Sequence, residues 1–554
     1  MNRMRDLLDE EVHEFPEHER APVAGSPATP AHGRATRLAY VLVALLVGMT
    51  AGMGSALVNV NTQQLQRLFD LSANQVAWLP TSYVMTAVSA NLLLIKVRQQ
   101  YGLRRFALVF LGLYAALALA HLFVSDLGAT LLLRATSGFV AVALIPLCLF
   151  HMMQALPSEW RLRGLVLGIG VTQCAMPLAR VLSPSLLASQ GPRSLFMFEA
   201  GLALLSLAAV GLVRLPPAVR VSVFKPLDLL IFVLMGGGLA LIAAVLGLGR
   251  WEGWFQAPWI LVSLLVAIPA LVAAAAIDTY RETPLLNLRW LRRGDVARFA
   301  AAIFMARIVL AEQEVAVAVV KSLGATNHQL WTLSLVMFGG AVAGVLASAV
   351  SVNAEKLARP IMLSIGIVAI AALIDSAATD PHHLQRFYVS QAAIAFAGTF
   401  FLGPALLLGI TSALQQGSRE LISFIVLFGV VNALGALAGP ALLGSHTDWS
   451  VAATGATQGA QLDTLRLAAG IAAFTTIYLA ILLAIRIRRR LKELRALDFA
   501  GPALQPGAPD APGVQSIDSG WRPPRPGNAP AAVFAAIAIV GVALLLAAWG
   551  LPAL

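Results

Sequence analysis

The sequence contains little charge for its length. Only 12% of its 554 residues are Asp, Glu, Lys or Arg, whereas 58% are apolar, and the mean hydropathy is +0.78. Water-soluble domains carry about a quarter charged residues. The deficit therefore excludes an ordinary soluble enzyme and a disordered polyelectrolyte, and we expect lipid to be the solvent for most of the chain.

Cysteine and other ligand-forming residues are also scarce. The two cysteines, Cys148 and Cys174, lie in apolar stretches, and two are too few for a disulfide scaffold or a cysteine metal site. The adjacent His382 and His383 have no further Cys or His ligands nearby. No phosphate-binding loop precedes a predicted helix, and no soluble domain offers room for catalysis. We therefore expect neither an enzyme nor a bound metal or cofactor.

Basic residues exceed acidic ones, 39 to 28, and the formal net charge is +11. Nucleic-acid binding would require these charges on one soluble face, but they occur in short clusters between long apolar runs. We therefore expect no nucleic-acid partner and attribute the basic clusters to orientation in a membrane.

Long apolar runs fill most of the chain. A helix needs about 20 mostly apolar residues to cross the hydrocarbon layer, because its backbone groups must be satisfied within the segment. Fifteen stretches meet this requirement. The predicted spans are 38–58, 74–95, 105–124, 128–152, 164–186, 194–213, 228–248, 257–277, 297–320, 329–351, 360–377, 386–411, 421–443, 465–485 and 530–550.

The charge of the loops predicts the orientation. Most Lys and Arg residues fall in alternate loops, among them Arg161, Arg163 and Arg292. Short basic loops stay in the cytoplasm, so we expect a cytoplasmic N-terminus and, after fifteen spans, a periplasmic C-terminus. The polar residues 1–36 lack the basic start and apolar core of a signal peptide.

Several local motifs occur in an order that resembles a known family. The second span contains WLPTSY (Trp78 to Tyr83), the first contains the run Leu57 to Val60, and RETPLLNLRWLRR (Arg281 to Arg293) follows the eighth. The fourth span contributes Arg134, Gly138, Ile145 and Pro146. Together, over residues 38–490, these motifs resemble the major facilitator superfamily, specifically the fourteen-span drug:proton antiporters of the EmrB/QacA group.

The resemblance implies an all-α polytopic membrane fold of two six-helix bundles that rock against each other around a site near the midplane. Two helices would be inserted between the bundles, and one additional helix would follow at the C-terminus. The expected localisation is the bacterial inner membrane. The predicted parts are a cytoplasmic tail (1–36), an N-terminal bundle (37–214), the inserted helices and loop (215–296), a C-terminal bundle (297–490), a Pro- and Gly-rich linker (491–529) and the additional helix (530–554).

Some family motifs are kept and others are changed. The loop after the second span keeps Gly102, Arg104 and Arg105 as gating residues, but Ile95 replaces the motif's first Gly and Gln99 stands at its acidic position. The family's first-span acid falls at Gly54. In the fifth span the family's Gly-Pro pair falls near Arg180 and Val181, whereas Gly439 and Pro440 keep such a pair in the thirteenth, where helices are expected to approach closely and bend.

Two arginines lie deep in predicted spans, Arg180 in the fifth and Arg307 in the ninth. An ionisable side chain at this depth is costly and tends to face a wet cavity or a partner. Because the guanidinium group is a permanently charged fork that suits carboxylate, both are candidate ligands of an anionic substrate. The alternative is a buried ion pair with Glu199 or Glu314.

Acidic residues of the ninth span are candidates for proton coupling. Glu314 is seven residues from Arg307 and so is expected on the same helix face, whereas Glu312 lies about 160° away from Glu314. A carboxyl group in low-dielectric surroundings favours its protonated form, and Glu312 is the better proton carrier because it lacks the arginine neighbour. The alternative places Glu312 near the outer leaflet in contact with water, and Glu199 is expected in a solvated vestibule.

Arg134 and several uncharged residues complete the candidate site. Arg134 resembles a family arginine implicated in proton coupling, and its alternative role is a structural bond to a first-span carbonyl or to Asn59. Asn59, Trp78, Tyr83 and Gln173 are candidate substrate ligands. The alternatives are that the polar residues tie helices together and that Trp78 belongs to the interfacial aromatic belt.

These observations favour a proton-coupled secondary transporter that exports small amphipathic or aromatic compounds, with a preference for organic anions. Its partners are then the small-molecule substrate, protons and the lipid bilayer. Two alternatives remain: a transport-inactive membrane scaffold or sensor, suggested by the changed motifs, and uptake of an organic anion by proton symport. The additional C-terminal helix is either an anchor or a docking helix for a periplasmic adaptor protein.

Overall fold

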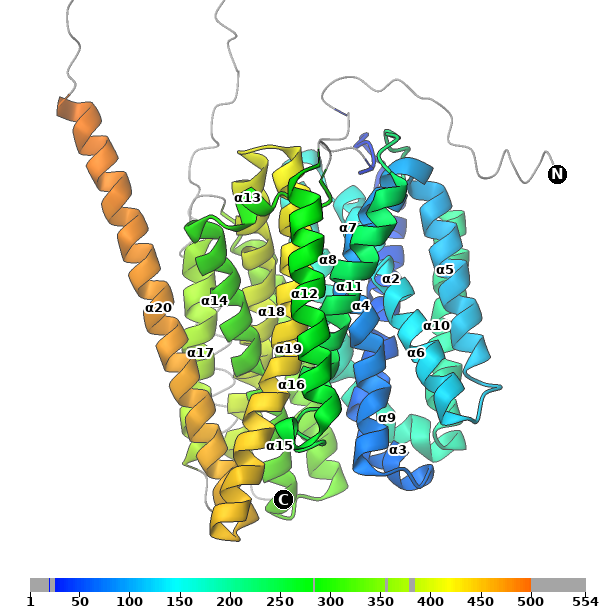
Figure 1. Cartoon of the computed structure of the whole chain (residues 1–554), viewed down its shortest axis with the longest axis vertical. Helices are drawn as coiled ribbons and strands as arrows, with labels where there is room; N and C mark the ends of the chain where they lie inside the picture. The colour runs from blue at the N-terminus through cyan, green and yellow to red at the C-terminus, as the bar shows by residue number, and fades with distance from the viewer. Residues whose placement is uncertain (1–18, 20–24, 282–283, 354–356, 378–383, 500–554) are drawn as a thin grey trace, which may run out of the picture. The chain divides into compact units, whose positions relative to one another are not determined.

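The computed structural model describes residues 19, 25–281, 284–353, 357–377 and 384–499 (Figure 1). The chain divides into two units, residues 1–475 and 476–554. The described part of the second unit, residues 476–499, is the C-terminal portion of one long helix, α20 (Thr457–Phe499). The fifteenth predicted span and most of the predicted linker lie outside the described residues, so the additional helix and its adaptor stay predictions.

The described residues of the first half form nine α-helices before the inserted pair. They are α2 (Arg34–Val60), α3 (Thr62–Leu68), α4 (Ala73–Tyr101), α5 (Leu103–Ala120), α6 (Leu127–Ala141), α7 (Leu144–Ala155), α8 (Arg161–Gln173), α9 (Ala175–Gln190) and α10 (Arg193–Leu212). We refer to this group as the N-half.

The inserted pair and the second half follow. The inserted helices are α11 (Pro226–Leu248) and α12 (Pro258–Thr279), joined to the second half through the short α13 (Leu288–Leu291). The remaining helices, called the C-half, are α14 (Gly294–Leu310), α15 (Glu312–Ser322), α16 (Asn327–Val350), α17 (Ala358–Ser376), α18 (Leu384–Leu414), α19 (Ser418–Thr454) and the start of α20.

The predicted all-α polytopic fold is confirmed. Within the described residues, thirteen helical segments are long and apolar enough to cross a membrane, and they coincide with the predicted spans other than the ninth and the fifteenth. The ninth is interrupted at Ala311, between α14 and α15. Around this residue the backbone bonds reach back three residues, from Ala311 N–H to Ile308 O and from Glu314 N–H to Ala311 O, both at 3.1 Å.

Local sequence signals explain several helix ends. The Ser72 hydroxyl accepts a hydrogen bond from the Gln75 N–H, and the Gln75 side-chain oxygen accepts one from the Ser72 N–H, so α4 begins with a complete capping box. Gly102 ends α4 and precedes α5 with φ of 83°, a left-handed value that favours glycine. The retained Gly102 of the motif therefore has a structural role at this junction.

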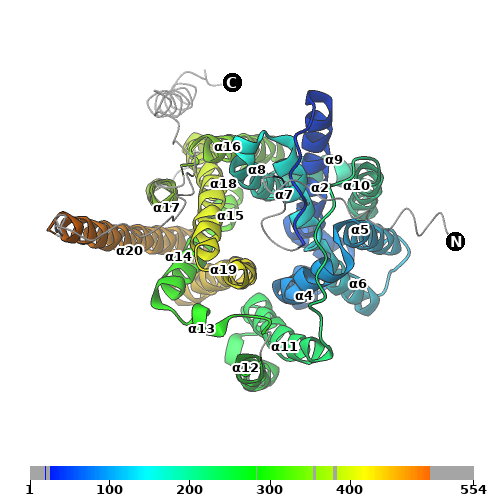
Figure 2. The same ribbon diagram turned by 90° about the horizontal axis from the view of Figure 1, so that it is seen from above.

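Helices of each half pack mainly against one another, and a few helices also contact the other half. In the N-half α2 packs against α7, α9 and α10, and in the C-half α18 packs against α16 and α17. Contacts between the halves come from α8 and α9 against α16, α8 against α18, and α4 against α19 (Figure 2). Gly170 of α8 lies so close to Val345 of α16 that an added Cβ would sit 2.6 Å from a methyl group.

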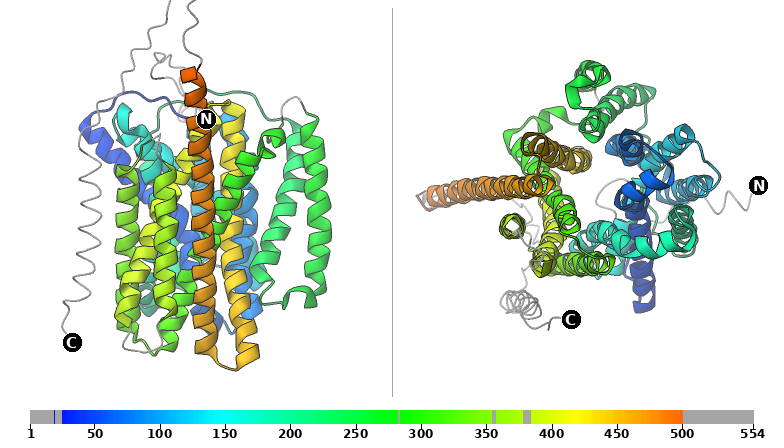
Figure 3. Two further views of the ribbon diagram at one scale, coloured as in Figure 1. Left: turned by 90° about the vertical axis from the view of Figure 1, so that its left-hand side faces the viewer. Right: turned by 90° about the horizontal axis from the view of Figure 1, so that it is seen from below.

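The inserted helices line the side of the first unit where α4 meets α19. There α11 packs against α4, α12 and α19, and the views in Figure 3 place α11 and α12 together at one edge of the unit. Many apolar side chains of α12 are exposed, including Leu261, Val262 and Leu265. In a membrane this exposed apolar surface faces lipid.

Candidate functional site

Arg180 of α9 lies where the N-half meets the C-half. Its half-buried guanidinium donates to the Met337 sulfur of α16 at 3.8 Å. Glu314 of α15 is the acidic group that interacts electrostatically with Arg180. The two do not form one of the direct ion pairs present in the described part of the chain. Arg180 is therefore available to a further anion.

Arg307 is a second half-buried cation with no carboxylate bound to it. Its buried Nε has no hydrogen-bond partner among the described residues. Gly435 of α19 lies against it, because a Cβ added there would be 2.7 Å from the Arg307 Cβ. The expectation that Arg307 and Glu314 share one face of a continuous helix is wrong, since the helix is interrupted between them at Ala311.

Glu312 and Glu314 occupy different surroundings, as their spacing predicts. Glu314 is exposed and interacts with Arg180 and Arg250. Glu312 is 0% exposed, so its predicted alternative contact with water is wrong. The Gln391 amide of α18 donates to both Glu312 carboxyl oxygens at 3.2 Å and holds the group inside the C-half.

A second buried carboxyl group joins Glu312. Asp375, at the end of α17, is 0% exposed and accepts from the Gln391 amide at 2.8 Å and from the Ser390 hydroxyl. The carboxyl groups of Asp375 and Glu312 are also within hydrogen-bonding reach of each other. No Lys, Arg or His pairs with either group among the described ion pairs. Two buried carboxylates without a cation are strongly unfavourable, which makes this pair a candidate proton-binding site.

Arg134 of α6 is completely buried in the N-half. Its Nη1 donates to the Gly54 carbonyl oxygen of α2 at 2.8 Å, and its guanidinium lies 4.7 Å from the centre of the Tyr83 ring. The predicted bond to a first-span carbonyl is therefore present. Tyr83 is only 6% exposed, and Arg134 occupies one face of its ring.

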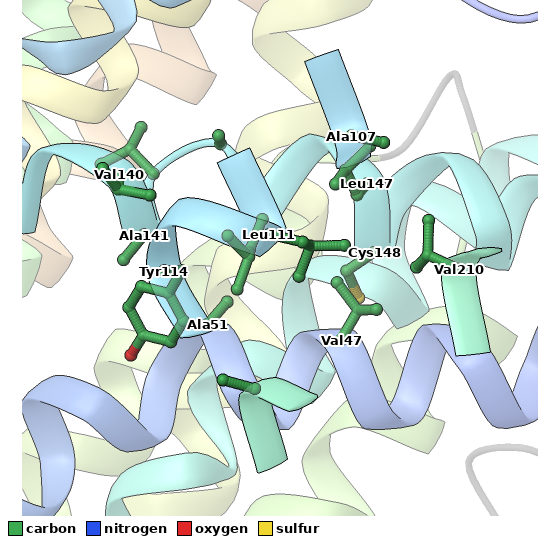
Figure 4. Close-up of a cluster of buried hydrophobic side chains, with 14 of the residues drawn as sticks. Val47, Ala51, Ala107, Leu111, Tyr114, Val140, Ala141, Leu147, Cys148 and Val210 are labelled. Carbon is green, nitrogen blue, oxygen red and sulfur yellow. The ribbon is translucent and has the colours of Figure 1, made fainter. Parts of the chain in front are cut away.

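Glu199 of α10 is buried, which corrects its expected place in a solvated vestibule. Its side chain is 2% exposed and accepts a hydrogen bond from the Tyr114 hydroxyl at 2.7 Å. The Tyr114 ring belongs to an apolar cluster with Val47, Ala51 and Leu111 (Figure 4). Packing of α10 against α2 and α5 encloses the carboxyl group.

His121, just past the end of α5, neighbours the same group. Its ring stacks on Phe196 at 5.1 Å, its Nδ1 bonds to the Leu117 carbonyl oxygen at 2.8 Å, and its buried Nε2 has no partner among the described residues. Burial lowers the pKa of His121 below the ordinary 6.5, and the charge of Glu199 opposes this shift.

This lowered pKa predicts acid sensitivity. The folded protein disfavours protonated His121, whereas the unfolded chain takes up its proton near the ordinary pKa, so stability is present above that pH and falls as pH falls below it, by up to about 1.4 kcal/mol per pH unit. The thermal stability of the detergent-solubilised wild type should fall between pH 7.5 and pH 5.5, and that of His121→Gln should fall less. His328→Gln, which changes an exposed histidine, should lose as much thermal stability over this pH range as the wild type.

The other candidate substrate ligands are dispersed. Asn59 is exposed at the end of α2, Gln173 donates to the neighbouring Thr172 hydroxyl at 3.3 Å, and the Trp78 ring lies 6.2 Å from that of Trp259 in α12. In the described structure none of the three is hydrogen-bonded to Arg180 or Arg307. Trp78 packs against an inserted helix, an arrangement compatible with its interfacial alternative.

The predicted gating residues lie at helix junctions. Arg104 and Arg105 follow Gly102 on α5 and are half-buried. Gly439 of α19 lies against the interruption between α14 and α15, because an added Cβ would be 2.6 Å from the Ala311 Cβ. The predicted close helix approach is thus present beside Pro440, which lies within α19.

A charged network at the predicted cytoplasmic end escaped the sequence analysis. The Lys96 ammonium of α4 lies 3.0 Å from Asp228 of α11, and the Arg281 guanidinium lies 2.7 Å from Asp228 and 3.5 Å from Asp278. Both aspartates are 0% exposed. Asp278 also accepts the backbone N–H groups of Leu285 and Leu286 at 2.8 and 2.9 Å. The network joins the N-half to the inserted pair.

Asp228→Asn should destabilise the protein strongly. It would leave two buried cations without their shared carboxylate, and breaking a buried pair in this way costs about 3–5 kcal/mol. Unfolding of the detergent-solubilised variant should show this loss. Asp463→Asn is the matched control, because Asp463 pairs with Arg466 on the surface and an exposed pair contributes at most about 1 kcal/mol. Equal stability of the two variants would contradict the prediction.

Comparison with known proteins agrees with this architecture. Residues 44–311 match the family model of the Major Facilitator Superfamily. The crystal structure of the human organic anion transporter MFSD10 (TETRAN) is similar, with a TM-score of 0.54, 13% identity, and coverage of 81% of this chain and 100% of that one. The proton:xylose symporter XylE, bound to 6-bromo-6-deoxy-D-glucose, gives a TM-score of 0.52, 14% identity, and coverage of 79% and 95%.

A search of curated proteins gave no match, and the resemblance to the fourteen-span EmrB/QacA group stays a prediction. The family model covers residues 44–311, and the two similar structures cover 81% and 79% of the chain. The chain therefore has the fold of the major facilitator superfamily transporters.

Proposed function

We propose that the protein is a proton-coupled secondary transporter that exports small aromatic or amphipathic organic anions across the bacterial inner membrane. The observation that carries this proposal is the pair Arg180 and Arg307. Arg180 lies within a spanning segment and Arg307 within α14, the first part of the interrupted ninth span. Both guanidinium groups are half-buried and have no direct carboxylate partner in the described structure.

The chemistry of these arginines supports an anionic substrate. A guanidinium group remains charged under all physiological conditions and binds carboxylate or sulfonate through two parallel hydrogen bonds. Leaving such a group unpaired at membrane depth is costly, so a substrate anion that pairs with it lowers the free energy of the complex. Arg180 comes from the N-half and Arg307 from the C-half, which is the arrangement that alternating access between two bundles requires.

The buried pair of Glu312 and Asp375 supports proton coupling. It contains two carboxyl groups, a shared amide donor, and no cation that could replace a proton. Proton uptake or release there changes the charge of a buried site, and this change favours one arrangement of the surrounding helices over another. A proton gradient can then drive substrate transport.

The proposal is tested with the full chain in proteoliposomes that carry a pH gradient. We expect gradient-dependent accumulation of 1-naphthalenesulfonate, an aromatic anion that stays charged, and little accumulation of the cation ethidium. Preferential transport of ethidium would refute the anion preference. If none of the anions and cations in a broader panel is moved, the transport-inactive scaffold becomes the better interpretation.

A further inference from the structure

The space beside Gly54 of α2 is filled by polar groups from other helices. A Cβ added to Gly54 would overlap the Tyr114 hydroxyl of α5 and would lie 2.6 Å from Glu199 Oε1 of α10. Any side chain on α2 at this position would therefore compete for the volume that the Glu199 carboxyl group occupies. The packing places an acid at this point of the N-half although α2 itself does not supply one.

We propose that Glu199 is a second proton-binding carboxyl group of the transport cycle, delivered by α10 to the space left open at Gly54. This inference rests on the proposed function. The carboxylate takes a proton from water on the predicted outer side and releases it to water on the predicted cytoplasmic side, and no other bond changes. Its role is distinct from that of the Glu312 and Asp375 pair, which lies in the other half.

The groups around Glu199 suit a carboxyl group that changes charge. Three neighbouring helices contribute titratable or charged groups near Glu199: Tyr83 from α4, Tyr114 from α5 with His121 just past its end, and Arg134 from α6. Gly54 of α2 has no side chain. Tyr114 donates to Glu199, and the Tyr83 and Tyr114 hydroxyls interact. Arg134 is the permanent cation of this group.

Arg134 gives a second, independent observation: its buried guanidinium has N–H groups that no described residue accepts. It is 0% exposed, yet its Nε and Nη2 have no hydrogen-bond partner among the described residues, and no ion pair joins it to Glu199. A buried guanidinium with free N–H groups attracts a carboxylate. Deprotonated Glu199 is therefore drawn toward Arg134, whereas the protonated group is not, and loss of the proton shifts the position of α10 relative to α6.

His121 marks the side from which the proton arrives. It follows α5 at the predicted outer end, and its Nδ1 bonds to the Leu117 carbonyl oxygen. Its Nε2 is left as a buried nitrogen without a partner in the described structure. This buried nitrogen is a titratable atom at the predicted outer end of α5, close enough to Glu199 to be affected by its charge.

The decisive experiment compares Glu199→Gln, Glu199→Ala and the double variant Gly54→Asp with Glu199→Ala, each as the full chain in proteoliposomes. Gln keeps the size of the side chain and imitates the protonated acid, so the carrier can return without a proton. We expect downhill movement of 1-naphthalenesulfonate to persist and its accumulation to fall about tenfold per unit of pH gradient for each coupled proton lost. Glu199→Ala should behave similarly.

The double variant restores a carboxyl group to the same space from α2. Gly54→Asp alone must displace both the Tyr114 hydroxyl and the Glu199 carboxyl group and should express poorly. The double variant has only the hydroxyl at the far end of Tyr114 to displace, and we expect it to recover at least about a third of wild-type accumulation. If the double variant moves substrate downhill but recovers no accumulation, the proposal is overturned. Wild-type accumulation by Glu199→Gln would overturn it as well.

The controls separate this proposal from the function on which it rests. A wild-type protein that moves no probe refutes the proposed function, whereas a wild-type protein and a Glu199→Gln variant that couple protons equally refute only the role of Glu199. If Glu199→Gln fails to reach the membrane, Glu199→Ala and the double variant decide by themselves. Proton flux per substrate, recorded with a pH dye, is the readout that a purely structural role would not change.

Discussion

Arg180→Ala is expected to abolish accumulation of 1-naphthalenesulfonate while the protein still inserts and folds. Truncating one partner of a buried, hydrogen-bonded charge pair costs about 2–5 kcal/mol of binding, which corresponds to roughly 30-fold or more in affinity. Among the described residues the guanidinium donates only to the Met337 sulfur, at 3.8 Å, so little internal structure depends on it. The loss should therefore appear in transport and much less in thermal stability.

Matched variants make this prediction specific to charge and geometry. Arg180→Lys keeps the charge but loses the two-pronged donor, and we expect transport between that of wild type and Arg180→Ala. Arg466→Ala removes a guanidinium whose side chain is 62% exposed and should transport normally. Wild-type accumulation by Arg180→Ala, measured with equal protein in the vesicles, would exclude Arg180 as a substrate ligand.

The fold could be predicted from the sequence because the dominant constraint is local. An apolar run of about 20 residues must be helical in lipid, and this rule found every spanning segment among the described residues. It also counted the ninth span as one helix. The interruption at Ala311 was not predictable from hydropathy, because hydropathy reports the apolar content of a segment and not the path of its backbone.

The charged sites depend on contacts between distant helices, and there the sequence was less informative. Asp375 stands at the end of the predicted span 360–377, where an acid ordinarily reaches water, but α18 brings Gln391 and Ser390 over it. Glu199 was misjudged for the same reason. Whether a residue at a span end is buried depends on packing and not on its position along the chain. The signal in the sequence was that Asp375 and Glu199 are acids within apolar runs.

The network of Lys96, Asp228 and Arg281 shows a further limit. Each of these residues lies at or just past a span end. Lys96 and Arg281 counted toward orientation, Arg281 also begins the motif after the eighth span, and Asp228 was given no role. Their pairing requires α11 to lie against α4, which the inserted position of α11 in the chain does not by itself specify. By contrast, the bond from Arg134 to a first-span carbonyl was among the predicted alternatives, because a buried arginine has few acceptors other than backbone oxygens.

Glu312→Gln is expected to uncouple transport from the proton gradient. The amide occupies the same volume beside Gln391 but cannot release a proton, so Asp375 loses the carboxyl group with which it would share one. Since a gradient of one pH unit stores about 1.4 kcal/mol per proton, loss of one coupled proton should lower steady-state accumulation about tenfold per unit while downhill transport continues. Both quantities can be measured in the same proteoliposomes.

Asp375 supplies the test that a shared proton is involved. Because Glu312 and Asp375 both accept from Gln391 and lie within reach of each other, Asp375→Asn should produce the same uncoupling, and the double variant should be no worse than either single one. Glu314→Gln is the control, since that exposed side chain interacts with Arg180 and should change substrate affinity and leave coupling intact. If Glu314→Gln uncouples transport and Glu312→Gln does not, the proton is carried on the other face of α15, and the buried pair serves only to hold α15, α17 and α18 together.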